Sequence, residues 1–188
     1  TFEDSNARFI PHIEAMNYLK SRGITDDIIK KYKIGYTATG DFAYRIIVPS
    51  FNKEGTLNYF IARSFVPKKM KYKNPTAAKD EIIFNEGLID WNKDVYLVEG
   101  AFDGFFLDNS IVMLGKKMSK LLFETLYEKT NGNLIICLDE DAQSDALKLY
   151  HTLNGGRLYN KIKIIKPPKG MDVADLRGQI DEYYYEIK

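Results

Sequence analysis

The sequence is poor in the residues that cross-link a chain or anchor it in a membrane. Its single cysteine, Cys137, excludes an internal disulfide framework, and only two histidines accompany it, which leaves too few ligands for a Cys/His zinc site. No run of about 18 apolar residues occurs, so we expect no membrane-spanning segment. No signal peptide is recognisable, and we expect a cytoplasmic protein in a reducing compartment. Because the chain begins with Thr1 instead of methionine, we interpret it as a piece of a longer protein.

The sequence does contain enough apolar residues for a core, and its charges are unevenly distributed. Hydrophobic residues make up 45% of the 188 positions, which predicts a folded protein. The net charge of +1 combines a basic stretch, residues 1–80 with 14 Lys/Arg against 8 Asp/Glu, and an acidic one, residues 81–188 with 13 against 18. This asymmetry suits a protein that holds polyanions with one part and cations with the other. Chance variation along a neutral chain explains it equally well.

The first module, residues 1–90, has the pattern of a small α+β unit. Residues 14–33 predict two short helices, the second capped by a threonine. Residues 44–51 and 56–65 are rich in β-branched and aromatic side chains and predict a β-hairpin around the turn NKEG. The lysine-rich segment 66–81 contains two prolines and predicts a loop.

In the second module, residues 91–188, short apolar segments alternate with helical ones. The apolar segments VYLV, IVML, NLIICL and KIKII predict strands, and helices are expected near residues 102–108, 118–130 and 142–153, with a closing helical segment at the end. Alternation of this kind is typical of a mainly parallel sheet with helices on both faces. We therefore predict an α/β fold for this module.

Carboxylates follow three of the predicted strands directly. The carboxyl ends of parallel strands lie at one edge of a sheet, so these groups are expected to converge there. Like charges gathered in this way repel, and a hard cation such as Mg²⁺ or Mn²⁺ would compensate them. Singly, most of these acids fit an ordinary helix cap or turn, but glutamate is a poor cap. The acids are Glu99 and Asp103 after the first strand, Asp139 and Asp141 after the third, and Asp172 and Asp175 after the last.

The motifs VEGAFD, CLDED and GMD, in this order, resemble the TOPRIM fold shared by topoisomerases and primases. The first module makes the resemblance more specific. Its segments YLKSRGITDDIIKKYKIGY, RIIVPSFNKEGTLNYFIARSF and KYKNP resemble the catalytic core of bacterial and phage DNA primases. The resemblance runs from about residue 14 to residue 176. It implies a TOPRIM-type, mainly parallel sheet with flanking helices, preceded by a smaller α+β module that contains a β-hairpin.

The resemblance also implies an activity. Primase cores synthesise short RNA primers on a single-stranded DNA template by metal-dependent nucleotidyl transfer from ribonucleoside triphosphates, with Mg²⁺ or Mn²⁺. A replicative helicase is the expected partner, through regions outside this fragment, in a bacterial or phage-infected cell.

Carried over residue by residue, the resemblance implies two sets of functional side chains. The catalytic, metal-binding acids are Glu99, Asp139 and Asp141, with Asp103 and Asp172 as further metal ligands. The residues that line the nucleic-acid and nucleotide groove are Arg45, Arg63, Lys71 and Lys73. Lys68 and Lys69 are interpreted as solvated loop charges.

Two departures from the family pattern leave other functions open. The family motif Asp-Gly-Asp-x-Ala-Gly reads DEDAQS at residues 139–144, and Asn85 stands where the family commonly has a lysine. This divergence resembles that of a phage or mobile-element protein. The alternatives are a TOPRIM nuclease that hydrolyses phosphodiesters with the same acids, and a degenerate module that binds nucleic acid or a partner protein without catalysis.

Overall fold

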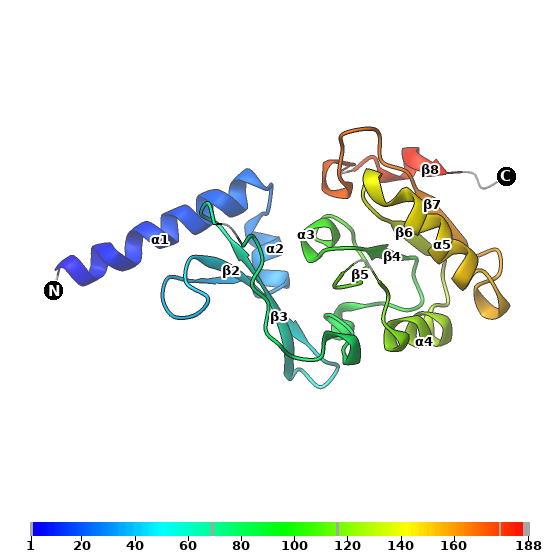
Figure 1. The fold of residues 1–188 in the computed structure, drawn as a ribbon, viewed down its shortest axis with the longest axis horizontal. Coiled ribbons are helices and arrows are strands. Elements are labelled where there is room, and N and C mark those ends of the chain that lie inside the picture. The colour runs from blue at the N-terminus through cyan, green and yellow to red at the C-terminus, as the bar shows by residue number, and fades with distance from the viewer. Residues whose placement is uncertain (1, 69, 116, 177, 186–188) are drawn as a thin grey trace. The chain divides into compact units, whose positions relative to one another are not determined.

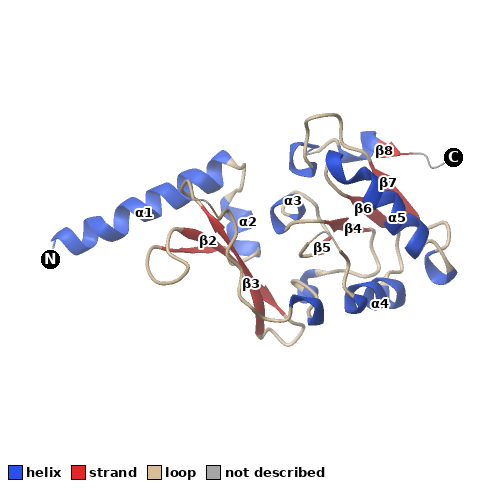
Figure 2. Ribbon diagram, in the orientation of Figure 1, coloured by secondary structure: helices blue, strands red, loops and turns tan. Residues whose placement is uncertain are grey.

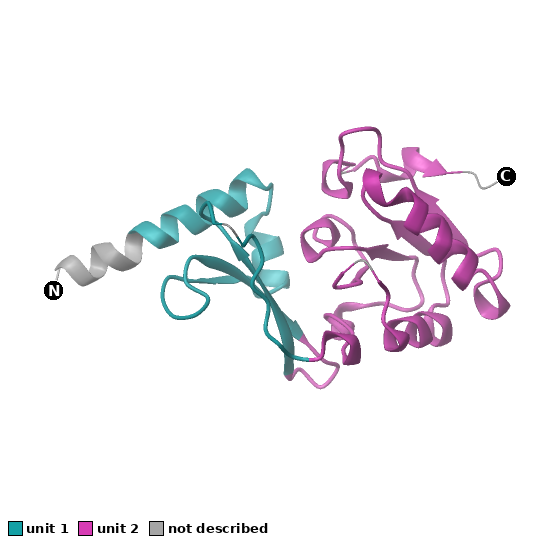
Figure 3. Ribbon diagram, viewed as in Figure 1, with its two compact units in different colours: residues 1–50, 57–77 teal, residues 51–56, 78–188 magenta. Residues whose placement is uncertain are grey.

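The computed structural model describes residues 2–68, 70–115, 117–176 and 178–185, and the chain divides into two compact units (Figure 3). Unit 1 contains residues 1–50 and 57–77, and unit 2 contains residues 51–56 and 78–188. Within the described ranges, none of the helices combines the length and apolar character that a bilayer crossing requires.

Unit 1 begins with two helices, α1 (Phe2–Ser21) and α2 (Asp26–Lys31). Gly23 takes a positive φ of 71° just after the end of α1, as expected for a residue that terminates a helix. Thr25 caps α2 by accepting a hydrogen bond from the Ile28 N–H at 3.4 Å. The second predicted helix and its threonine cap are therefore confirmed. The first helix is not the short one expected within residues 14–33, because it has 20 residues and begins at Phe2.

Three strands form the sheet of unit 1: β1 (Gly35–Thr37), β2 (Arg45–Phe51) and β3 (Leu57–Ser64), in the order β1-β2-β3. The predicted hairpin is confirmed as β2 and β3, and Gly55 closes its turn with a φ of 79°. Strand β1, antiparallel to β2, was not predicted because three residues are too few to show a period-two pattern.

The sheet of unit 2 has the order β5-β4-β6-β7-β8 and is built from β4 (Val95–Val98), β5 (Ser110–Val112), β6 (Leu134–Cys137), β7 (Ile162–Ile165) and β8 (Tyr184–Tyr185) (Figure 1). The first four strands are parallel and β8 is antiparallel to β7. In the register of the sheet, Val98 on β4 pairs with Cys137 on β6, and Cys137 pairs with Ile165 on β7. The mainly parallel sheet is confirmed, and its carboxyl ends lie level with one another.

The helices of unit 2 are α3 (Ala101–Gly104), α4 (Lys120–Lys129) and α5 (Gln143–Leu153) (Figure 2). Helix α5 packs on β6 and β7, with Leu153 and Ala146 fully buried in the core. Single 3₁₀ turns complete the unit: η1 (Lys79–Glu81), η2 (Glu86–Leu88), η3 (Glu140–Ala142), η4 (Gly156–Leu158), η5 (Val173–Leu176) and η6 (Ile180–Tyr183).

Two predicted helices are shorter than expected. The helix predicted near residues 102–108 is the single turn α3, which ends at Gly104, where a Cβ atom would lie 2.6 Å from Ser110 Oγ. The closing helical segment consists of the 3₁₀ turns η5 and η6, followed by β8. Gly178, with a φ of 73°, lies between these turns and prevents one continuous helix.

Residues 78–90 belong to unit 2, whereas the sequence placed the division between residues 90 and 91. Glu86 is one residue that joins this segment to unit 2, because its Oε1 lies 2.6 Å from Lys129 Nζ on α4 and 3.3 Å from Lys53 Nζ in the hairpin turn. Asn85 has a φ of 52°, which asparagine tolerates well, and its Oδ1 accepts a hydrogen bond from the Phe51 N–H at 3.1 Å. Asn85 thus has a structural role at the position where a lysine was expected.

The ion pairs of Glu86 predict a pH-dependent contribution to stability. Burial by itself would raise the pKa of Glu86, but the hydrogen bonds and charges of Lys129 and Lys53 outweigh it and hold the pKa below its ordinary value of 4.5. Glu86→Gln is therefore expected to lower the free energy of unfolding by about 1–2 kcal/mol at pH 7. This loss should be present above pH 4.5 and disappear as the pH falls through the lowered pKa of the folded state.

Urea denaturation of both proteins between pH 3 and pH 7 measures the effect. The matched control is Glu124→Gln, because Glu124 forms an exposed pair with Lys120 at 3.5 Å and should change stability by less than about 0.5 kcal/mol. Equal effects of the two substitutions would contradict the structural role of Glu86.

Candidate active site

Glu99 directly follows β4, at the carboxyl edge of the parallel sheet, and Gly100 then starts α3. Asp103, in the first turn of α3, accepts a hydrogen bond from the Gly100 N–H at 3.2 Å through its Oδ2. A Cβ atom at Gly100 would lie 2.9 Å from the same oxygen, so glycine lets this carboxylate close over the start of the helix. Asp103 therefore has a local capping role, and its predicted role as a metal ligand stays a prediction.

Asp139 and Asp141 lie in the connection between β6 and α5. The side chains of β6 and Leu138 are at most 1% exposed, so the chain leaves the core only at Asp139. The 3₁₀ turn η3 follows Asp139 at once. Gln143 donates hydrogen bonds from Nε2 to the carbonyl oxygens of Leu138 and Asp139, at 3.2 and 3.3 Å. The sequence analysis did not predict a role for Gln143. Its hydrogen bonds stabilise the loop in this chain, which lacks the glycines of the family motif.

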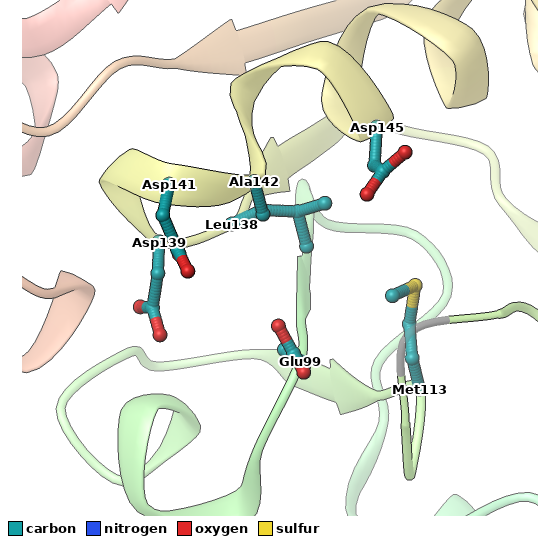
Figure 4. A pocket seen from close by; sticks show the side chains of 7 residues that line it. All are labelled: Glu99, Met113, Leu138, Asp139, Asp141, Ala142 and Asp145. Carbon is teal, nitrogen blue, oxygen red and sulfur yellow. The ribbon is translucent and has the colours of Figure 1, made fainter.

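The acids after β4 and β6 line one cavity of about 170 Å³. Figure 4 shows the side chains of Asp139 and Asp141 extending from the same turn toward the end of β4, where Glu99 lies. Asp145, in the first turn of α5, also lines this cavity and forms an ion pair with Lys148 at 2.8 Å. Asp145 was not predicted, because an aspartate in the first turn of a helix is an ordinary feature of sequences. The remaining lining residues are Met113, Leu138 and Ala142.

Asp172 and Asp175, just before and within the 3₁₀ turn η5, lie close enough to Asp139 for their charges to act on it. Each caps the other, since Asp172 Oδ1 accepts from the Asp175 N–H at 3.1 Å and Asp175 Oδ2 accepts from the Asp172 N–H at 3.0 Å. Partial burial raises the pKa of the Asp139 carboxyl, and the charge of Asp172 raises it further. A hydrogen bond from the backbone of Val173 lowers this pKa, and the charges of Asp141 and Asp175 again raise it. The structure thus places Asp139 within the field of three other aspartates.

The oxygen-only character of this group suits a hard cation. Across the described part of the chain, no group of three or more Asp, Glu, His or Cys side chains is arranged so that it could bind a metal ion. Mg²⁺ commonly keeps several waters and binds through one or two carboxylates, so it does not need such a preformed cage. The chemistry of Glu99, Asp139 and Asp141 therefore fits Mg²⁺ or Mn²⁺, and the metal stays a prediction.

The two predicted groove arginines lie inside unit 1. Arg45 is 4% exposed and donates to the carbonyl oxygens of Lys71 at 3.1 Å, Met70 at 3.0 Å and Ala62 at 3.4 Å. Its guanidinium therefore fastens the segment after β3 to the sheet. The binding role predicted for Arg45 is untested, but a structural role is evident.

Arg63 is 5% exposed and lies against two tyrosine rings. Its Cζ is 5.8 Å from the ring centre of Tyr18 and 5.3 Å from that of Tyr72, and its Nη1 donates to Tyr72 Oη at 2.7 Å. Lys71 is exposed beside the same Tyr72 ring, at 6.0 Å. The groove roles predicted for Arg63 and Lys71 stay predictions.

The lysines of the same segment pack against the turn that precedes β2. Lys73 donates to the Asp41 carbonyl at 2.8 Å, and Lys68 donates to the Ala43 carbonyl at 2.9 Å. The interpretation of Lys68 as an exposed loop charge is compatible with the structure, because the residue is exposed even though its ammonium has a backbone partner. Lys69 lies outside the described residues.

Solved structures of DNA primases share this architecture. The E. coli primase catalytic core matches with a TM-score of 0.72 and 20% identity, over 92% of this chain and 71% of that one. A DnaG primase catalytic domain bound to single-stranded DNA matches with a TM-score of 0.72 and 20% identity, over 87% of this chain and 66% of that one. The chain has the fold of the DnaG primase catalytic core.

A curated sequence relative agrees with this fold. The DNA primase of Staphylococcus epidermidis is 24% identical over 89% of this chain, and the alignment covers 36% of that protein. The chain thus spans about a third of the length of this curated relative. No protein-family model matches the sequence. The resemblance to the primase core seen in the motifs is confirmed at the level of the fold.

The raised pKa of Asp139 predicts that its charge destabilises the fold when no metal is present. In a metal-free buffer at pH 7, Asp139→Asn is expected to raise the melting temperature by about 2–4 °C. Because the folded pKa exceeds the ordinary value of 3.8, the cost is present above the folded pKa and vanishes below pH 3.8. Melting curves of both proteins from pH 3 to pH 7 measure the difference, and a variant that is less stable at pH 7 would contradict it.

Divalent cations provide a second prediction for the same acids. A cation that binds between Glu99, Asp139 and Asp141 stabilises only the folded state, so its binding energy adds to the stability of the wild type. Mn²⁺ or Mg²⁺ should therefore raise the melting temperature of the wild type more than that of Asp139→Asn. The exposed variant Glu124→Gln is the control and should respond as the wild type does. Equal responses of wild type and Asp139→Asn would exclude Asp139 as a ligand.

Proposed function

We propose that this chain is the catalytic core of a DNA primase, which synthesises short RNA primers on single-stranded DNA by nucleotidyl transfer from ribonucleoside triphosphates. The observation that carries this proposal is the shared cavity of Glu99, Asp139 and Asp141 at the carboxyl edge of a sheet with the primase-core fold. Two neighbouring structures support a DNA template, since one is a DnaG primase catalytic domain bound to single-stranded DNA and the other is a DnaG RNA polymerase domain in complex with a DNA duplex that has an overhang.

In this proposal the three acids of the cavity would hold divalent cations, with Asp172 and Asp175 adding negative charge beside Asp139. The cations would stabilise the attacking and leaving oxygens of an in-line displacement. The fold supports this geometry in two ways. The register that pairs Val98 with Cys137 brings Glu99 and the Asp139 turn to the same edge of the sheet. Hydrogen bonds from Gln143 and from the Val173 backbone stabilise the Asp139 loop. The activity would take place in the cytoplasm of a bacterial or phage-infected cell, with a helicase recruited by regions outside this fragment.

The alternative of a binding module without catalysis has one observation in its favour, which is the absence of a preformed three-ligand site among the described residues. A TOPRIM nuclease would use the same cavity, but it leaves unit 1 without a role. Unit 1 matters for this choice because the structural likeness extends over both units, with 92% of the chain aligned to the E. coli core. We therefore place primer synthesis first.

Primer synthesis on single-stranded DNA, with labelled ribonucleotides and Mn²⁺ or Mg²⁺, tests the proposal. Glu99→Gln and Asp139→Asn should each lower product formation by about 100-fold or more, because each removes a charge that the displacement depends on. Glu124→Gln, on the exposed face of α4, should retain full activity. A primed template should be included, so that weak initiation is distinguished from absent chemistry.

The other outcomes each identify a different function. Shortening of the DNA in place of RNA synthesis would favour the nuclease, and binding without product would favour the module without catalysis. Equal product from the wild type and Glu99→Gln would show that the acids of this cavity are not the catalytic ones.

A further inference from the structure

The turn before β2 presents two aromatic rings, each with a lysine over it. Lys68 Nζ lies 5.3 Å from the ring centre of Tyr44, and Lys73 Nζ lies 5.3 Å from that of Phe42. Both ammonium groups also donate a hydrogen bond to a carbonyl oxygen of the same turn, as described above. We call these four residues the aromatic–lysine platform, and all of them belong to unit 1.

Tyr44 is the unusual member of the platform, because it has a positive φ of 60°. A bulky residue in this left-handed region is strained relative to an ordinary conformation, and glycine or asparagine would avoid most of the strain. The conformation is held by the surrounding chain, since the Tyr44 N–H donates to the Thr37 carbonyl at 2.7 Å and the Tyr44 carbonyl accepts from the Phe65 N–H at 3.2 Å. The side chain gains little burial in return, since Tyr44 is 39% exposed.

A row of aromatic rings supports Tyr44 from inside the unit. The rings of Tyr44 and Phe65 have their centres 6.0 Å apart in an edge-on arrangement, Phe65 contacts Tyr36 at 6.4 Å, and Tyr36 contacts His12 at 5.5 Å. Phe65 is 9% exposed, so the row joins the exposed ring to the interior. Tyr44 is therefore a well-supported residue that is 39% exposed, with the Lys68 ammonium over its ring.

A fixed ring beside ammonium groups is the combination that binds a nucleotide of a single strand. Any base can stack on an aromatic face, and a base on the Tyr44 ring would take the place of the Lys68 ammonium, which could then neutralise its phosphate. A protein partner explains the strain less well, because a positive-φ glycine or asparagine would leave the lysines equally able to bind its acidic groups. A duplex would not use the ring, since its bases are already stacked.

We propose that Tyr44 is a base-stacking residue for single-stranded DNA, with Lys68 and Lys73 as its phosphate partners. The inference deepens the proposed primase function by assigning part of the template site, and it makes no use of the acids or of a metal. It also explains why a strained and exposed tyrosine is kept at the turn.

Binding of a fluorescent oligothymidylate to the 188-residue chain, in EDTA, tests this inference without any catalysis. Tyr44→Asn removes the ring but suits the positive φ, so it should melt at or above the wild-type temperature and bind the oligonucleotide about 5- to 150-fold more weakly. Tyr44→Phe keeps the ring and should bind as the wild type does. Tyr159→Asn, at a tyrosine that is 63% exposed in unit 2, is the matched control and should also bind normally.

Salt dependence separates stacking from charge. Tyr44→Asn should leave the slope of log K against log salt unchanged, whereas Lys68→Met should reduce its magnitude by about 0.7, the value for one phosphate contact on a single strand. If Tyr44→Asn fails to fold, Tyr44→Gly is the substitute, because glycine adopts this φ freely.

The outcomes distinguish this inference from the proposed function. Normal binding by Tyr44→Asn would overturn the stacking role even if the wild type makes primers. Weakened binding by Tyr44→Asn would support the role even if the wild type makes none. No binding by the wild type at low salt, or an equal loss of binding in Tyr159→Asn, would also overturn it. A stronger effect of Tyr44→Asn on binding to an RNA oligonucleotide than to DNA would overturn the assignment of the bound strand to DNA.

Discussion

The candidate active site depends on the register of the parallel strands, which brings their carboxyl ends to the same height in the sheet. Val98 on β4 pairs with Cys137 on β6, so the residues that follow these strands leave the core at the same height. Glu99 and the Asp139 turn are 40 positions apart in the chain and meet only because of this pairing. A one-residue shift of the register would carry the carboxylates past one another and would turn every side chain of the shifted strand to the other face of the sheet.

The convergence of acids has a cost that the surrounding chain reduces with short-range hydrogen bonds. Asp103 closes over the start of α3, while Asp172 and Asp175 cap each other in η5. The Val173 N–H partly offsets the repulsion at Asp139. These contacts order each loop separately, but they do not remove the mutual repulsion of the acids. A site whose carboxylates repel one another in this way is suited to a cationic ligand.

Unit 1 uses its cations differently. The two buried arginines, Arg45 and Arg63, serve the interior, where they bind carbonyl oxygens and tyrosine rings of the segment after β3. The lysines of this segment remain near the surface, on aromatic rings at the turn before β2. The strained conformation of Tyr44 belongs to this turn. The basic residues of the first half of the chain thus fall into two groups: buried arginines with a structural role, and lysines near the surface that can bind a polyanion.

Much of the fold could be read from the sequence because it rests on local patterns. Apolar segments of four or five residues predicted β4, β6 and β7, and Thr25 predicted the start of α2. Elements of two or three residues, such as β1 and β8, escaped because they are too short to show a period and exist only through pairing with a neighbour. The boundary of the units escaped because residues 78–90 contact segments distant in sequence, as the ion pairs of Glu86 with Lys53 and Lys129 illustrate.

The order of the acidic motifs in the sequence by itself indicated which carboxylates belong to one site, because parallel strands end at one edge. Only the tertiary structure decided what each side chain contacts. It added Asp145 and Gln143 to the site, gave Asp103 a capping role, and placed Arg45 in the interior. It also revealed the positive φ of Tyr44. The physical reason is that a residue type determines which interactions are available, whereas burial, backbone conformation and partners depend on segments brought together by folding.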